Sequence, residues 1–84
     1  MDSKHQKTLE AIFETPERAN ILWRDVESLL IALGADITDG NGSRRRVALK
    51  GVRAVFHRPH PRKETGKGAV ESVRRFLEAA GVKP

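Results

Sequence analysis

Two neighbouring segments of alternating polarity constrain the fold of this chain more than any other feature. Residues 44–49 and 52–57 alternate between apolar and polar side chains, and the dipeptide Lys50-Gly51 separates them. Alternation with a period of two is typical of half-buried strands, and a two-residue loop containing glycine favours a tight hairpin. The sequence therefore predicts an antiparallel pair of strands whose register is set by this turn.

The register sorts the side chains of the predicted hairpin onto two faces. Leu49 would face Val52, and successive pairs lead back to Arg44 opposite His57. A slip of one residue would bury three arginines, so the pattern strongly favours this register. We expect one face to be buried and apolar, with Val47, Leu49, Val52, Ala54 and Phe56, and the other to be open, with Arg44, Arg46, Arg53 and His57.

Three helices and one more strand complete the expected fold. Apolar stripes at helical spacing predict helices over residues 3–14, 24–33 and 67–80. A short strand is expected over 36–39, with a glycine-rich turn at 40–42 before the hairpin. The order α-α-β-β-β-α predicts an α+β fold of two layers, in which helices cover one face of a three-stranded antiparallel sheet.

The composition excludes several kinds of chemistry. The chain has 84 residues and no cysteine, so it can form neither a disulfide nor a thiolate nucleophile nor a cysteine-ligated zinc site. Its longest apolar run, Leu29 to Leu33, is far shorter than the roughly 20 residues that span a membrane. Its first residues lack the apolar stretch of a signal peptide. We therefore expect a cytoplasmic protein with no membrane association.

The charge is divided unevenly along the chain. Residues 1–43 carry 4 basic and 8 acidic side chains, a net charge of −4, whereas residues 44–84 carry 12 basic and 3 acidic ones, a net charge of +9. Between residues 44 and 63 there is no acidic side chain. Such asymmetry indicates a polyanionic partner, either nucleic acid or an acidic protein, although a merely solvated basic surface would look the same.

The open face of the predicted hairpin combines groups that can cleave RNA. Cleavage by the RNA's own 2′-hydroxyl needs a base, an acid and cations that stabilise the charge on the phosphate. His57 can supply an imidazole and Arg44 and Arg46 the cations, and His60 is a second imidazole three residues further on. Directly opposed residues have Cβ atoms about 4.5–5.5 Å apart, so Arg44 and His57 could act on one phosphate.

His57 and His60 also have two other interpretations. A role without catalysis stays open, and a metal site is disfavoured. Both imidazoles could bind phosphate, or cap the end of a strand, without any catalysis. A metal site built on His57 and His60 is not expected, because Pro59 and Pro61 hold the segment extended and no carboxylate precedes Glu64.

Four short motifs, in this order and spacing, resemble the HicA toxins of type II toxin–antitoxin systems. The resemblance covers about residues 24–82 and makes residues 1–19 an N-terminal helical extension of a HicA-like domain at 20–84. The motifs are Leu33-Gly34-Ala35, Gly42-Ser43, Pro59-His60-Pro61-Arg62-Lys63-Glu64 and Lys67-Gly68.

The resemblance implies a specific activity, with one departure from the family pattern. It implies a double-stranded-RNA-binding-like fold, ribosome-independent cleavage of mRNA that arrests translation, and neutralisation by a HicB-like antitoxin. Family members typically carry a catalytic histidine directly after Gly-Ser, where this chain has Arg44. Arginine stays protonated at neutral pH and cannot act as a general base. Either a histidine at another position supplies the catalytic imidazole, His57 or else His60, or the chain binds RNA without cutting it.

The candidate site therefore consists of a catalytic group and an RNA-binding group of residues. We expect it to require no metal ion and no small-molecule cofactor. The alternative function is a non-catalytic nucleic-acid-binding module or an inactive toxin homologue. Because Phe56 is expected to point inward and Trp23 to start a helix, recognition of RNA shape or backbone is favoured over stacking on aromatic rings. The candidate catalytic residues are His57, His60 and Arg44, and the candidate RNA-binding residues are Arg45, Arg46, Arg53, Arg58, Arg62, Lys63 and Lys67.

Overall fold

The computed structural model describes residues 1–84. The three strands of the main sheet have the bounds that the sequence predicts, whereas the helices end one or two residues earlier. None of these helices has the length and apolar character needed to cross a membrane. In chain order the elements are α1 (Ser3–Ile12), β1 (Ile21–Leu22), α2 (Trp23–Ala32), β2 (Asp36–Asp39), β3 (Arg44–Leu49), β4 (Val52–His57), β5 (Glu64–Thr65) and α3 (Lys67–Ala79).

The hairpin of β3 and β4 has the predicted register. Leu49 pairs with Val52 and Arg44 pairs with His57, in an antiparallel sheet of order β2-β3-β4. The turn residues Lys50 and Gly51 both have positive φ values, 49° and 80°. This is the backbone of the tight turns whose twist matches that of the flanking strands. Lys50 therefore holds a conformation that an L-residue adopts at a cost of about 1–2 kcal/mol.

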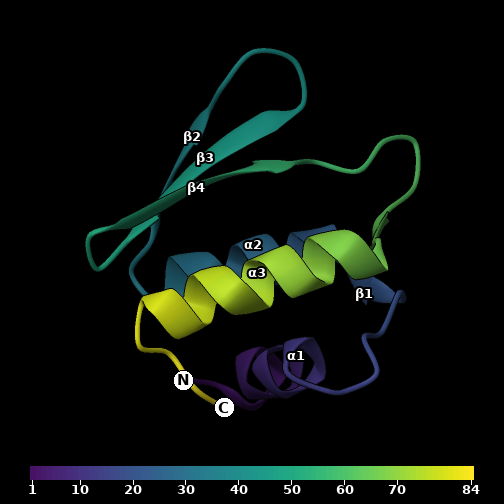
Figure 1. The fold of residues 1–84 in the computed structure, drawn as a ribbon, viewed down its shortest axis with the longest axis vertical. Coiled ribbons are helices and arrows are strands. Elements are labelled where there is room, and N and C mark those ends of the chain that lie inside the picture. Colours follow the sequence, from purple (N-terminus) through teal and green to yellow (C-terminus); the bar gives the residue numbers. More distant parts are fainter.

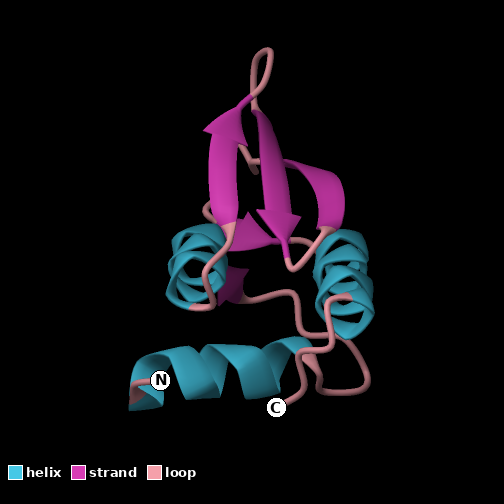
Figure 2. Ribbon diagram, turned by 90° about the vertical axis from the view of Figure 1, so that its left-hand side faces the viewer, coloured by secondary structure: helices cyan, strands magenta, loops and turns pink.

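The molecule is arranged in layers, with all the helices on one side of the sheet. Figures 1 and 2 show the three-stranded sheet lying over α2 and α3, which run side by side. The α+β architecture with helices on one face is thus confirmed. In the same views α1 lies on the far side of α2 and α3 and crosses them steeply. The opposite face of the sheet has no helix over it.

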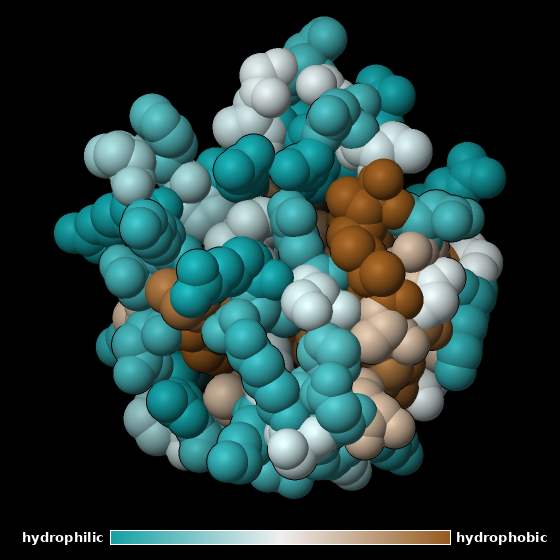
Figure 3. Space-filling model, turned by 180° about the vertical axis from the view of Figure 1, so that it is seen from behind, coloured by the Kyte–Doolittle hydropathy of each residue, from teal (hydrophilic) through white to brown (hydrophobic).

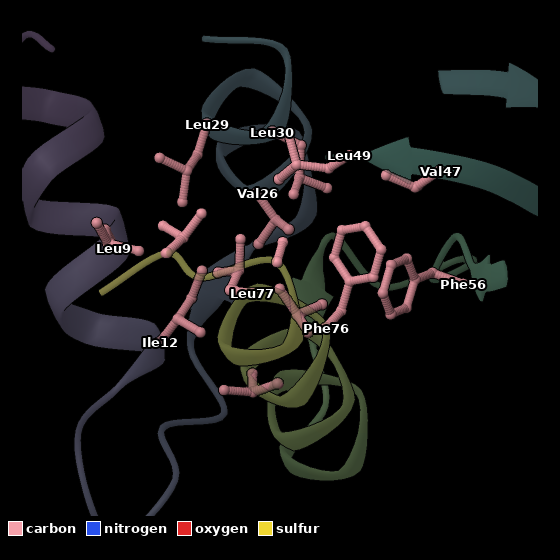
Figure 4. Close-up of a cluster of buried hydrophobic side chains, with 14 of the residues drawn as sticks. Leu9, Ile12, Val26, Leu29, Leu30, Val47, Leu49, Phe56, Phe76 and Leu77 are labelled. Carbon is pink, nitrogen blue, oxygen red and sulfur yellow. The ribbon is translucent and has the colours of Figure 1, made fainter. Parts of the chain in front are cut away.

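One apolar core joins these layers. It contains sixteen buried apolar residues from the helices, the strands and the segment after α3. The Phe56 ring, from β4, lies 6.1 Å from the Trp23 ring of α2 and 5.6 Å from the Phe76 ring of α3, measured between centroids. Figure 4 shows Leu9 and Ile12 of α1 among the same cluster of side chains. The sheet and all three helices therefore share a single core.

A second, two-stranded sheet was not predicted. β1 pairs antiparallel with β5, so that Ile21 faces Thr65 and Leu22 faces Glu64. The amide of Trp23 also donates a hydrogen bond to the carbonyl of Lys63, at 2.9 Å. This pairing connects the segments that precede α2 and α3. It consequently holds the end of the loop at residues 58–63 against the start of α2.

The helix α1 is tied to α3 through one arginine. The Arg74 guanidinium donates to the carbonyl oxygens of Ile12, at 3.0 Å, and Glu14, at 3.3 Å. It also lies 3.2 Å from the Glu17 carboxylate. The pKa of the Glu17 carboxyl is lowered, first by hydrogen bonding with its own backbone amide and further by the charge of Arg74. A cation at this end of α1 satisfies carbonyls that the helix itself leaves free.

Candidate nucleic-acid interface

The uncovered side of the main sheet is a basic surface, which we call the open sheet face. Its residues alternate along the strands with those that point into the core. Across the sheet they form three rows of directly paired residues, which we call rungs. All of its charged side chains are exposed. The rungs are Asp36, Ala48 and Arg53; Thr38, Arg46 and Val55; and Arg44 with His57.

A backbone hydrogen bond adjoins the rung of Arg44 and His57, which lies where β3 begins and β4 ends. The amide of Arg58, directly after His57, donates a hydrogen bond to the carbonyl of Ser43, directly before Arg44, at 2.8 Å. The ladder of β3 and β4 thus continues one residue beyond the rung. The predicted pairing of Arg44 with His57 on one exposed face is present in the structure.

The arginines of the open sheet face have no acidic partners. Every salt bridge of the molecule involves other basic residues, at the helices or on the covered side of the sheet. Arg44, Arg46 and Arg53 are therefore free to pair with an external anion. Guanidinium groups suit phosphate because they offer several donors in a planar fork.

Arg45 lies on the other side of the sheet from these arginines. It pairs with the buried Phe56, and its side chain is only 21% exposed. Its Nε atom lies 3.2 Å from the Glu27 carboxylate of α2, and its guanidinium also contacts Asp39 of β2. Sequence alternation places it there, between the exposed Arg44 and Arg46. The structure thus gives Arg45 a link between sheet and helix and does not bring it to the open sheet face.

His60 belongs to a second basic region, which we call the loop groove. It lines a hollow of about 470 Å³ together with Ser43 and Arg58, and an adjoining one of about 360 Å³ together with Arg24 and Arg62. None of these residues lines the hollow on the open sheet face. The loop groove is lined by the basic residues Arg24, Arg45, Arg58, Arg62 and Lys63, by His60, and by the acidic residues Glu27 and Asp39.

The loop groove separates candidates that are close in the sequence. His57 ends β4 on the open sheet face, whereas His60, three residues on, faces the start of α2. Arg24 of α2 joins the groove and was not among the predicted residues, because it lies in the acidic part of the chain, where no local pattern marks it. Lys67 begins α3 and is exposed, but it lines neither region.

The α2 side of the molecule differs from these basic regions. Figure 3, seen from behind, shows an apolar patch interrupting a largely hydrophilic surface. Ile31 of α2 is 61% exposed, more than any other large apolar residue except Met1. Apolar side chains give phosphates nothing to bind, so the open sheet face and the loop groove are the surfaces suited to a polyanion. Nowhere do three His, Asp or Glu side chains gather in a way that could hold a metal ion.

Comparison with known proteins adds one match. A family model described as "HicA toxin of bacterial toxin-antitoxin" matches residues 23–82. This range runs from the first residue of α2 to just beyond α3 and leaves out α1. No curated protein and no solved structure matched the chain.

Proposed function

The chain belongs to the HicA family of bacterial toxins, and from this we propose that it cleaves mRNA on its open sheet face. One observation carries the proposal: His57 and Arg44 share a rung there, with Arg46 on the next rung. This pairing supports a role for His57, because its position neighbours those of Arg44 and Arg46 on one face although the residue after Gly42-Ser43 is an arginine. His57 takes the role that the family gives to a histidine at that position.

The reaction is an attack by the RNA on itself. His57 removes the proton from a 2′-hydroxyl, and the resulting oxygen attacks the adjacent phosphorus. The bond to the 5′-oxygen breaks, leaving a 2′,3′-cyclic phosphate and a 5′-hydroxyl. Arg44 and Arg46 stabilise the negative charge that builds up on the phosphate oxygens. The leaving 5′-oxygen takes a proton from water, because His60 lies in the separate loop groove, and the hydroxide so formed takes back the proton that His57 holds.

The RNA would extend beyond the reacting nucleotide into the loop groove. Arg24, Arg58, Arg62 and Lys63 provide positive charge there, and the Ser43–Arg58 hydrogen bond adjoins both regions.

A HicB-like antitoxin would neutralise the toxin by covering the open sheet face, since masking these cations excludes RNA. We place this reaction in the cytoplasm, where mRNA is translated.

We also propose that residues 1–19 are an extension of the toxin domain at 20–84 rather than a domain of their own. The family match begins only at residue 23, and α1 contributes Leu9 and Ile12 to the common core. The extension would therefore stabilise the toxin without contacting the RNA.

The test compares the two histidines as matched variants. Purified wild-type protein is incubated with mRNA in EDTA, alongside His57→Ala and His60→Ala. We expect His57→Ala to lose about 10²- to 10⁴-fold in cleavage rate, the usual contribution of a general base. His60→Ala should stay within about tenfold of wild type, because a groove residue contributes binding only. Circular dichroism checks that both variants are folded. Full activity of His57→Ala would contradict the assignment of the base.

A second function is favoured by one feature, the arginine after Gly42-Ser43. If His57 does not replace the missing imidazole, the chain is a non-catalytic RNA-binding protein of the same family. In that case wild-type protein would shift RNA in a gel but leave it intact under the same conditions.

A further inference from the structure

We propose that the open sheet face holds one unpaired guanine beside the Arg44–His57 rung, and that Asp36 recognises this base. The inference rests on the proposed function, because it takes RNA as the ligand of this face. It adds a base-specific contact to a surface for which the proposed function assigns only contacts with phosphate.

The site is a shallow hollow in the middle of the open sheet face. Its volume is about 390 Å³, within the range of roughly 300–1,000 Å³ for small-ligand sites. Ala48 and Val55 form an apolar floor, and Val55 is 53% exposed. An apolar floor on an otherwise charged surface suits the flat face of a base better than it suits a phosphate. The side chains of Asp36, Thr38, Arg46 and Arg53 surround this floor.

Stacking in this hollow must come from the arginines. All three phenylalanine and tryptophan rings of the sheet–helix contact, Trp23, Phe56 and Phe76, are buried in the core. Planar guanidinium groups stack on bases as aromatic rings do. Arg46 and Arg53 line the hollow and are free of carboxylate partners. A base resting on Ala48 and Val55 could therefore be held by the guanidinium plane of Arg53, which the proposed reaction leaves unused.

Asp36 is the one acidic side chain on the open sheet face. It is exposed and forms no salt bridge, although two arginines line the same hollow. A carboxylate here repels phosphate, so it weakens general RNA binding. What it can do is accept hydrogen bonds, since an ionised carboxylate is an acceptor at both oxygens. Its position favours a ligand that presents donors rather than negative charge.

Guanine is the base whose edge fits a carboxylate. Its Watson–Crick edge presents two adjacent donors, N1–H and the N2 amino group, which match the two oxygens of one carboxylate. Adenine and cytosine present an amino group beside an acceptor nitrogen, and uracil presents a single donor between two acceptors. A bidentate contact with Asp36 is therefore available to guanine alone.

The hollow adjoins the proposed reaction centre. Arg46 and Val55 form the rung next to Arg44 and His57. Neighbouring rungs on one face are two residues apart along a strand, which is about 6.6 Å. A base over the Arg46–Val55 rung thus belongs to a nucleotide that flanks the cleaved bond.

The test measures binding without cleavage. Four short 2′-O-methyl oligonucleotides, uniform in sequence except for G, A, C or U at one position, lack the nucleophilic hydroxyl and cannot be cut by the proposed chemistry. Their affinities are measured by fluorescence anisotropy. We expect wild-type protein to bind the guanine oligonucleotide about 5- to 100-fold more tightly than the others, the discrimination usual for a bidentate contact. Asp36→Asn and Asp36→Ala should abolish this preference.

The control separates recognition from net charge. Glu78→Gln makes the same charge change at an exposed site on α3 and should keep the guanine preference while binding all four oligonucleotides slightly more tightly. Equal affinities for the four bases in wild-type protein, no binding at all, or a guanine preference that survives in both Asp36 variants would overturn the proposal. Because cleavage is not measured, a guanine preference in a protein that leaves natural RNA intact would refute only the proposed function.

Discussion

Arg44 follows Gly42-Ser43, where the resemblance to the HicA toxins implies a histidine, and its cross-strand neighbour is the imidazole-bearing His57. A histidine typical of the family would stand on β3, whereas here the imidazole of His57 stands on β4, directly opposite. Both positions lie on the same exposed rung. A phosphate bound there would meet one guanidinium and one imidazole, whichever of the two strands carries the histidine and whichever the arginine, because directly opposed side chains are within reach of one another.

Lys50 is a residue where the fold tolerates local strain. Its φ of 49° belongs to a region that asparagine and glycine adopt more readily than lysine. We predict that Lys50→Asn raises the free energy of unfolding by about 0.5–1 kcal/mol. Urea denaturation measures this, with Lys83→Asn, at an exposed position after α3, as the control for loss of charge. A Lys50→Asn protein no more stable than wild type would mean that the turn is not strained.

At the scale of elements, the strands were more predictable than their connections. The strand bounds and register of β3 and β4 follow from alternation, because one slipped residue would exchange a buried leucine or phenylalanine for an arginine. The pair of β1 and β5 has two residues in each strand, too few for alternation to be visible. Its pairing depends on contacts between residues more than forty positions apart, which no local pattern reveals.

Local sequence patterns also do not predict where α1 packs. An apolar stripe predicts that α1 exists, but not which surface it packs against. The structure places it under α2 and α3, where the Arg74 guanidinium binds the carbonyl of Ile12. The local sequence does not distinguish Arg74 from its neighbour Arg75. The Arg75 side chain forms a salt bridge with Glu71 on the surface of α3. Only the three-dimensional arrangement distinguishes the two arginines.

We predict that the packing of α1 contributes substantially to stability. Ile12 is fully buried, so Ile12→Ala should lower the free energy of unfolding by about 2–5 kcal/mol. Lys7→Ala, at an exposed position of the same helix, should change it by no more than about 0.5 kcal/mol. Thermal or chemical denaturation compares the two variants. If both changed stability equally little, α1 would not be part of the common core.

At the scale of the whole molecule, the fold converts a charge asymmetry along the chain into separate surfaces. Of the three arginines in a row that begin β3, two reach the open sheet face and the third, Arg45, turns to Glu27 of α2. The two C-terminal histidines are divided in the same way, His57 to the open sheet face and His60 to the loop groove. Alternation predicts the first division. The second depends on where the loop packs against α2, which the sequence does not show.

The central claim is that the reaction belongs to a rung of the open sheet face and not to one position in the chain. Exchanging the two side chains tests it most directly: His57→Arg alone is compared with the double variant Arg44→His/His57→Arg, in an RNA cleavage assay with EDTA. We predict that the single variant loses about 10²-fold or more in rate, because no imidazole remains on the face. The double variant should recover to within about tenfold of wild type. Undiminished cleavage by His57→Arg, or a double variant as inactive as the single one, would contradict the claim.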